Sequence, residues 1–257
     1  MTNEVFELVP RDSIFRGLIF ELGQTGEASR FKQPPLLYTS PTLAFGDFSM
    51  RANENPNKLP GSDFDDDLNG RGGGDLIMGR GGEDHGWGGA GNDLIIGGSG
   101  NDMLDGGTGT DTLFGGTDED RLYGHDGDDH LFGRAGADFL YGGAGDDRMF
   151  GGAANDVLIS QSGNDFLAGD GGADRLLVVG TDAALIRLEG GAGRDSFEFF
   201  NDGSVNVILD YEAGRDRVEL SNAGRGFSEE DLFFPQDLSP TSFAEDYGAQ
   251  TLADVDK

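Results

Sequence analysis

Several residue types that support common protein functions are absent or rare in this chain. No cysteine occurs among its 257 residues, so disulfides cannot form and no soft thiolate ligand is available for zinc or copper. Only three histidines are present, His85, His125 and His130, and neither a His-Glu-x-x-His motif nor a Gly-x-Ser-x-Gly nucleophile elbow occurs. We therefore expect no catalytic activity.

Basic residues and long apolar runs are also scarce. The chain has 18 Lys and Arg against 48 Asp and Glu, a formal net charge of −30. Such a surface repels phosphate groups, so nucleic acid and anionic membranes are unsuitable partners. No run of 18 apolar residues predicts a membrane span, and the N-terminus lacks the basic and apolar regions of a cleaved secretory signal.

Glycine, by contrast, occurs 46 times and marks a repeat. From Gly61 to Leu177 the chain reads as 13 consecutive nonapeptides of the form Gly-Gly-x-Gly-x-Asp-x-apolar-x, whose places we number one to nine. Clear copies are Gly88–Ile96 (GGAGNDLII) and Gly142–Phe150 (GGAGDDRMF). Place one is Gly except at Ser160, and place eight is apolar except at Gly86. A period this regular indicates a stacked repeat.

An acidic residue recurs at one phase of every nonapeptide. Residues 61–177 contain 24 acidic and 6 basic residues, a net charge of −18. Because one carboxylate always stands at place six, metal binding explains the acidity better than solubility does. These place-six residues are Asp66, Asp75, Asp84, Asp93, Asp102, Asp111, Asp120, Asp129, Asp138, Asp147, Asp156, Asp165 and Asp174.

The glycines complete the predicted binding loop. Glycine at places one and four is expected to adopt positive φ, turn the backbone tightly and direct carbonyl oxygens inward. Carbonyl and carboxylate oxygens are hard ligands, which favours Ca²⁺ over zinc or copper. The candidate loop residues that accompany the aspartates are Gly89, Gly91, Gly98, Gly100, Gly107, Gly109, Gly127, Gly136, Gly143, Gly145, Gly163 and Gly172.

This nonapeptide resembles the calcium-binding repeat of RTX (hemolysin-type) proteins, over a little under half of the chain. The resemblance implies a right-handed parallel β-roll with an ion between each loop and the loop two repeats further on, up to about 11 ions in the array. It also implies an extracellular protein exported by a type I secretion system. The segment Val207–Ser221 is similar to the endings of serralysin and alginate-epimerase RTX modules. That similarity implies antiparallel capping strands and further calcium ligands at Asp195, Asp210 and Asp216.

The predicted fold class is all-β. The three residues after each place-six Asp form a short strand whose place-eight side chain faces the core, and two nonapeptides make one coil. Stacked coils then form a two-sheet parallel solenoid. Its thin core is expected to contain Ile77, Ile95, Leu104, Leu113, Leu122, Leu131, Leu140, Met149, Leu158, Leu167 and Leu176.

Both flanks of the array are predicted to act as caps. Residues 1–60 are loop-rich and have few apolar positions, so they form either an N-terminal cap on the first coil or a small unit with a separate function. Residues 178–257 are expected to cap the other end. They contain one further repeat at 190–198, out of phase with the others, and an acidic tail.

Two irregularities bear on function. Phe64, Asp118 and Ala154 stand at place four, where positive φ is unfavourable, so we expect weaker sites near Phe64 and Ala154 than between Gly88 and Thr110. Place nine of alternate repeats forms an outward ladder, here called the apolar stripe. It either stabilises the sheet by stacking in register or binds a protein or surface partner. The apolar stripe consists of Met78, Ile96, Phe114, Phe132, Phe150 and Ala168.

The sequence thus predicts an extracellular calcium-binding β-roll that folds when Ca²⁺ binds and has no catalytic activity of its own. One alternative is the calcium-binding and secretion module of an RTX protease, lipase or epimerase, separated from its catalytic domain. Another is a surface or adhesion component that binds its partner through the apolar stripe.

Overall fold

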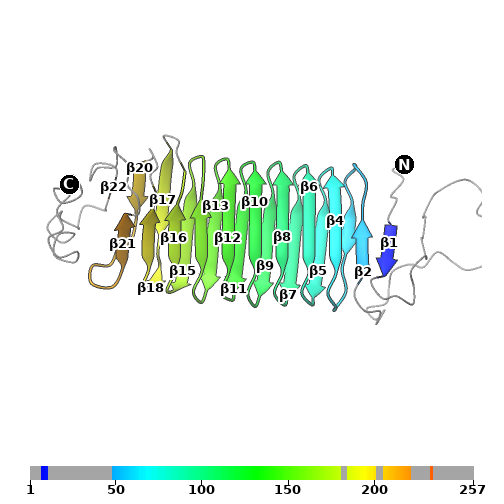
Figure 1. Cartoon of the computed structure of the whole chain (residues 1–257), viewed down its shortest axis with the longest axis horizontal. Helices are drawn as coiled ribbons and strands as arrows, with labels where there is room; N and C mark the ends of the chain where they lie inside the picture. The colour runs from blue at the N-terminus through cyan, green and yellow to red at the C-terminus, as the bar shows by residue number, and fades with distance from the viewer. Residues whose placement is uncertain (1–6, 11–47, 181–183, 201–204, 221–231, 234–257) are drawn as a thin grey trace, which may run out of the picture.

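The computed structural model describes residues 7–10, 48–180, 184–200, 205–220 and 232–233, which form an elongated roll of stacked coils (Figure 1). All regular secondary structure in these ranges is β-strand. Among the same residues, no helix has the length and hydropathy needed to cross a membrane.

Two sheets form the long walls of the roll. The first sheet contains, in spatial order, β1 (Glu7–Pro10), β2 (Phe48–Arg51), β4 (Asp67–Gly72), β6 (His85–Ala90), β8 (Met103–Thr108), β10 (Arg121–Asp126), β12 (Phe139–Ala144), β14 (Val157–Ser160), β16 (Arg175–Val178), β19 (Ser196–Phe199) and β21 (Arg217–Leu220). The second contains β3 (Lys58–Pro60), β5 (Leu76–Gly81), β7 (Leu94–Ser99), β9 (Thr112–Thr117), β11 (His130–Ala135), β13 (Arg148–Ala153), β15 (Phe166–Gly172), β17 (Leu185–Glu189), β20 (Val205–Ile208) and β22 (Leu232–Phe233). The short strand β18 (Ala192–Gly193) also pairs with β15.

The register of both sheets confirms that two nonapeptides make one coil. Leu122 in β10 lies opposite Leu104 in β8 and Leu140 in β12, and each pairing is parallel. From β2 to β17 the strands alternate between the sheets, so each of these strands pairs with the one two places away in sequence. The chain is therefore an all-β, parallel two-sheet solenoid, as predicted.

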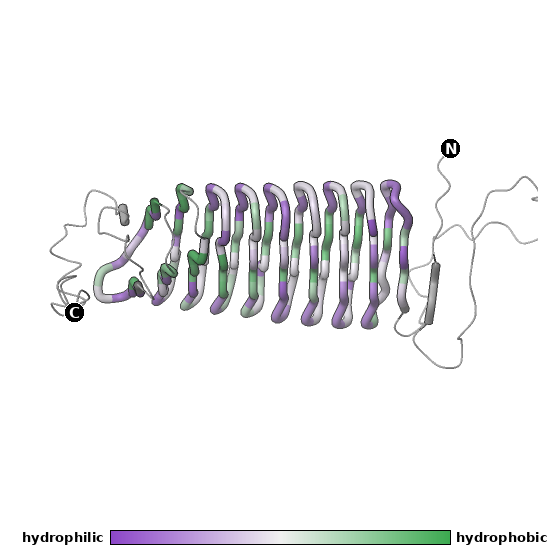
Figure 2. Tube along the Cα trace, turned by 45° about the horizontal axis from the view of Figure 1, so that its top comes forward, coloured by the Kyte–Doolittle hydropathy of each residue, from purple (hydrophilic) through white to green (hydrophobic). Residues whose placement is uncertain are grey.

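A single column of place-eight side chains fills the space between the sheets. All eleven predicted core residues, from Ile77 to Leu176, are at most 1% exposed. Gly86 interrupts the column, but Ile95 and Leu104 close the gap: a Cβ on Gly86 would lie 3.0 Å from Cγ2 of Ile95 and 3.3 Å from Cδ2 of Leu104. Figure 2 shows hydrophobic segments recurring along the strands of successive coils, with hydrophilic segments at the turns.

The strands are longer than the predicted three residues. In most repeats a strand covers places seven to nine and continues through places one to three of the next repeat, as in Leu94–Ser99. Glycines at place two therefore pair within the sheets, as Gly89 does with Gly107. Only places four to six form the turn. Glycine has no side chain, so the backbones of successive coils approach closely enough to pair through place three.

The predicted positions of positive φ need correction. Positive φ occurs at places two and four, for example +103° at Gly89 and +134° at Gly91, and not at place one. Several residues with side chains also adopt it, among them Arg80 at +89°, His125 at +75° and Ala154 at +87°. Most departures from glycine at these two places thus keep the positive φ, whereas Phe64 at place four does not adopt it.

The predicted antiparallel C-terminal cap is wrong for the described residues, whereas most of the acidic tail, at 221–231 and 234–257, lies outside the described ranges. Strand β21 pairs in parallel with β19, β20 with β17, and β22 with β20, so both sheets simply continue. The physical reason is that Ile186, Leu188, Phe197, Phe199 and Val218 enter the same core as the array residues. Burial of their apolar side chains favours a further parallel coil over a turn back across the end.

At the N-terminal end, β1 pairs antiparallel with β2 and forms the edge of the first sheet. Strands β2 and β3 already belong to the two parallel sheets. Both sheets therefore run without interruption across residues 60 and 61, and the first repeat stacks on a coil that the nonapeptide count does not include. The predicted N-terminal cap otherwise falls on residues 1–6 and 11–47, outside the described ranges.

Candidate metal centre

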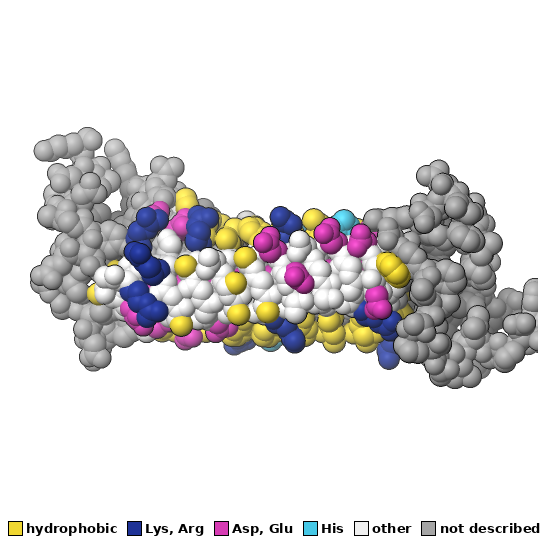
Figure 3. Space-filling view, turned by 90° about the horizontal axis from the view of Figure 1, so that it is seen from below, with side chains coloured by type: hydrophobic (Ala, Val, Ile, Leu, Met, Phe, Trp, Pro, Cys, Tyr) yellow, Lys and Arg dark blue, Asp and Glu magenta, His cyan; other side chains and the backbone are white. Residues whose placement is uncertain are grey.

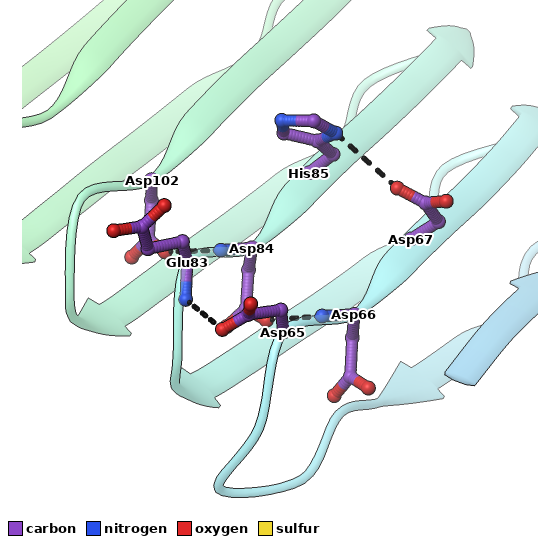
Figure 4. Close-up of polar contacts among 7 residues, drawn as sticks. All are labelled: Asp65, Asp66, Asp67, Glu83, Asp84, His85 and Asp102. Carbon is purple, nitrogen blue, oxygen red and sulfur yellow. Dashed lines mark hydrogen bonds and ion pairs between the residues drawn. The ribbon is translucent and has the colours of Figure 1, made fainter. Parts of the chain in front are cut away.

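The place-six aspartates form two ladders along the roll, one at each turn edge. The backbone N–H of each place-six residue donates to Oδ1 of the aspartate one coil further on, over 2.6–3.1 Å; Figure 4 shows Asp66 donating to Asp84 and Asp84 to Asp102. The first ladder is Asp66, Asp84, Asp102, Asp120, Asp138, Asp156, Asp174, Asp195 and Asp216. The second is Asn57, Asp75, Asp93, Asp111, Asp129, Asp147 and Asp165.

These carboxylates are buried, and most have one oxygen without a partner. The ladder aspartates are 0–3% exposed except Asp216, at 9%. Twelve of them have a buried Oδ2 that accepts no hydrogen bond: Asp75, Asp84, Asp93, Asp102, Asp111, Asp120, Asp129, Asp138, Asp147, Asp156, Asp174 and Asp195. A buried, unpaired carboxylate oxygen is unfavourable unless a cation or donor compensates it. The repetition of this feature indicates a missing positive partner.

Each unpaired oxygen points at the place-one glycine of its own repeat. A Cβ built on Gly97 would lie 2.2 Å from Oδ2 of Asp102 and 2.8 Å from the carbonyl oxygen of Gly115, one coil further on. At Gly88 the corresponding distances are 2.3 Å to Asp93 and 2.6 Å to the carbonyl of Gly106. Place one is therefore glycine because a carboxylate and a carbonyl oxygen approach it closely, and not because its φ is positive.

Further carbonyl oxygens lie along the coils beside the ladders. A Cβ on Gly107 would be 2.1 Å from the carbonyl oxygen of Gly89, and one on Gly109 would be 2.0 Å from that of Gly91. The carbonyls of places two and four thus lie close to the glycines of the next coil. Of the twelve predicted loop glycines, all have positive φ except Gly172.

This donor set fits a hard divalent cation. Among the described residues, no three His, Cys, Asp or Glu side chains are grouped as a metal site. An ion at the ladders must therefore combine a carboxylate with backbone carbonyls, a mixture of oxygen ligands that suits Ca²⁺ and excludes a zinc-type site. Asp102, with the backbone of Gly97 and Gly115, illustrates the residues that would hold it.

The electrostatics of the ladders point the same way. Burial, together with the charges of neighbouring aspartates, raises the pKa of Asp84, Asp120 and Asp147 from 3.8 to about 8. The same cause raises the pKa of Asp102 to about 7. The ionised form of these carboxylates is thus unfavourable in the folded roll. A divalent cation bound beside them would stabilise both the carboxylate charge and the fold.

Several arginines cluster at the C-terminal end of the described roll. Figure 3 looks onto one turn edge, where Lys and Arg gather toward the C-terminal end of the described chain. Arg175, Arg194, Arg215 and Arg217 line a shallow hollow there, and Arg175 binds Glu198 in a bidentate pair of 2.8 and 2.9 Å.

The three predicted ligands beyond the array have different surroundings. Asp195 and Asp216 continue the first ladder, each accepting a backbone N–H from the aspartate one coil before. Asp210 instead accepts hydrogen bonds with both oxygens, from the backbone N–H groups of Gly190 at 2.9 Å and Gly191 at 2.7 Å. Its carboxylate therefore fastens the start of the fourteenth repeat to the following coil.

Sequence reasoning missed two groups at the turns. Asn57 occupies the place-six position before the array and donates its N–H to Oδ1 of Asp75 over 2.7 Å. The sequence could have indicated this role, because Asn57 stands nine residues before Asp66 and is followed by the apolar Leu59 at place eight. Place-five residues form a second, exposed series of bonds: Asp128 accepts the N–H of Asp146 at 2.8 Å, and similar Asp and Asn bonds recur along both edges.

The apolar stripe forms as predicted on the outer face of the second sheet. Met78, Ile96, Phe114, Phe132 and Phe150 lie opposite one another in register. The ring centroids of Phe114 and Phe132 are 4.8 Å apart, and those of Phe132 and Phe150 are 5.1 Å apart with nearly parallel planes. Every member except the buried Ala168 is half-buried, so each ring is partly covered by its neighbours.

Comparison with known families agrees with this geometry. The family model of the RTX calcium-binding nonapeptide repeat, which spans four copies, matches residues 60–95, 83–113, 105–140, 123–158 and 141–176. Residues 60–176 thus consist of RTX calcium-binding repeats. No curated protein and no solved structure matches the chain significantly.

Proposed function

We propose that this protein is an extracellular calcium-binding β-roll, without catalytic activity of its own, whose repeats fold when Ca²⁺ binds. The observation that carries the proposal is the series of twelve buried aspartate oxygens without a hydrogen-bond donor. Their recurrence in RTX calcium-binding repeats supports Ca²⁺ as the missing partner.

Without metal, the balance of forces opposes folding. Residues 61–177 carry a net charge of −18, and the core is only one column of side chains wide. Ordering a chain so rich in glycine also has a large entropic cost. On the order of ten Ca²⁺ ions would add roughly 20 positive charges and compensate this repulsion. Binding and folding should then form one cooperative event.

The same property suits export. A type I secretion system requires an unfolded substrate, and cytosolic calcium is far below the concentration outside the cell. The repeats would therefore stay unfolded inside and form the roll outside. Type I export and the extracellular location are implied by the family of the repeats.

Far-UV circular dichroism during a calcium titration tests the proposal. We expect a sigmoidal gain of β-signal at sub-millimolar to millimolar Ca²⁺, reversed by a chelator and not reproduced by Mg²⁺, which requires a stricter geometry. A full β-spectrum in calcium-free buffer at neutral pH would contradict coupled folding. The absence of any bound calcium in equilibrium dialysis would contradict the proposed function itself.

A second candidate function rests on the apolar stripe. A row of half-buried aromatic rings on the outer face of the second sheet suits a partner or surface contact as well as in-register stacking. Phe132→Asp, compared with wild type by size-exclusion chromatography in calcium, separates the two. A loss of self-association supports a contact surface, whereas unchanged elution with lower thermal stability supports stacking alone.

A further inference from the structure

Three ladder aspartates differ from the other twelve, because a protein group already satisfies their second oxygen. Ser62 donates its backbone N–H and its hydroxyl to Oδ2 of Asp66, over 2.6 and 3.0 Å. The hydroxyl of Ser160 donates to Oδ2 of Asp165. Each of these donors replaces the positive partner that the other carboxylates lack.

The third case uses the backbone alone. Oδ2 of Asp216 accepts the N–H of Glu212 over 2.8 Å. All three carboxylates stand at ends of the ladders: Asp66 and Asp216 are the first and last members of the first ladder, and Asp165 is the last of the second. Among the described residues, each of these three carboxylates thus has its second oxygen satisfied by the protein at a terminal step of its ladder.

Ser160 is the most informative of these donors. It is the single exception to glycine at place one in the 13 repeats, and its side chain is fully buried. In each repeat whose aspartate has an unpaired Oδ2, place one is glycine, so no side chain at place one lies against that oxygen. The hydroxyl of Ser160 stands where an ion would approach Asp165.

We propose that calcium binds beside the twelve aspartates whose Oδ2 is unpaired, and that Ser62, Ser160 and the N–H of Glu212 close three ladder ends without metal. This inference rests on the proposed function. According to this proposal, Ser160 prevents calcium from binding at Asp165, so metal binding in the second ladder ends at Asp147.

A matched pair of substitutions tests it. Asp147 and Asp165 are adjacent in the second ladder, are 1% and 0% exposed, and each accepts a backbone N–H at 2.9 Å. Asp147→Asn should lower the number of bound ions by at least one, measured by equilibrium dialysis and atomic emission. Asp165→Asn should leave that number unchanged. Equal losses in the two variants would overturn the inference.

Ser160→Gly supplies an independent readout if Asp147→Asn fails to fold. It removes the hydroxyl and recreates the glycine of the other repeats, so the protein should bind one more ion than wild type. It should also unfold at a lower temperature than wild type in calcium-free buffer at the acidic pH where the metal-free roll is most stable. An unchanged ion count in Ser160→Gly contradicts the inference. A wild type that binds no calcium contradicts the proposed function instead.

Discussion

The backbone N–H of Asp102 donates to Oδ1 of Asp120 over 2.8 Å, while Oδ2 of Asp120 is buried and has no donor. One oxygen of the same carboxylate thus holds two coils together, and the other is left for a cation. Because every interior ladder member repeats this division, the loss of one carboxylate removes both a coil contact and a metal ligand.

Asp102→Ala should therefore affect calcium binding more than Asp66→Ala. Asp102 lies inside the first ladder with an unpaired oxygen, whereas Ser62 already satisfies Asp66. We expect the first substitution to lower calcium affinity and the cooperativity of binding, because the coils on both sides depend on it. Isothermal titration calorimetry of both variants measures the difference. Equal losses would show that position in the ladder is unimportant.

Gly97→Ala should destabilise the calcium-loaded roll by about 1–3 kcal/mol, the usual cost of overpacking. The new methyl group would lie 2.2 Å from Oδ2 of Asp102, so the carboxylate would have to move away from its position. Gly171→Ala is the control, since a Cβ there comes no closer than 3.6 Å to another atom. Thermal unfolding in excess calcium should separate the two variants, and similar melting temperatures would contradict the close approach at place one.

The metal-free roll should be more stable in mild acid than at slightly alkaline pH. Burial raises the pKa of Asp84 to about 8 and that of Asp102 to about 7, from 3.8, so the folded form binds these protons more tightly than the unfolded chain. Stability is then highest near the unfolded pKa and falls as pH rises through the folded values. In buffer stripped of calcium, the β-signal should decrease from about pH 5 to pH 8.

Calcium should reverse this dependence. Protons and Ca²⁺ compete for the same carboxylates, so the calcium concentration at the folding midpoint should fall as pH rises. Circular dichroism at several pH values measures both trends. A midpoint independent of pH would show that the raised pKa values of Asp84 and Asp102 play no part in binding.

Arg80→Gly should stabilise the calcium-loaded protein by about 0.5 kcal/mol. The left-handed backbone costs a residue with a side chain roughly 1–2 kcal/mol, and glycine returns only part of this through its flexible unfolded state. Arg80 has a φ of +89°. Arg121, exposed in β10 and without positive φ, is the control, and Arg121→Gly should be destabilising. Chemical denaturation in calcium measures both changes, and destabilisation of similar size in the two variants would contradict strain at Arg80.

The sequence predicted the parts of the fold that depend on period alone. A nine-residue repeat places Leu104, Leu122 and Leu140 on one sheet and in one core column, and it places the aspartates at the turn edges. It could not explain glycine at place one, because the pattern shows a requirement for glycine without its cause. That cause is the carboxylate of the same repeat, which only the folded coil brings within contact distance.

The C-terminal coils were mispredicted because their spacing changes. Asp174, Asp195 and Asp216 are 21 residues apart, so the nonapeptide frame ends while the first ladder continues. In the sequence, the added residues lie between β16 and β17 and between β19 and β20. The resemblance to other module endings then suggested a cap where the structure has further coils.

The register of 18 residues also determines how this protein can change in length. Removing one nonapeptide between Phe114 and Phe150 would transfer every later strand to the opposite sheet, so that these two residues, now on one face, would be separated. Removing or duplicating two nonapeptides would leave every strand on its sheet and every aspartate in its ladder. Growth by duplication is therefore expected to proceed by whole coils, and related proteins of different length should differ by even numbers of repeats.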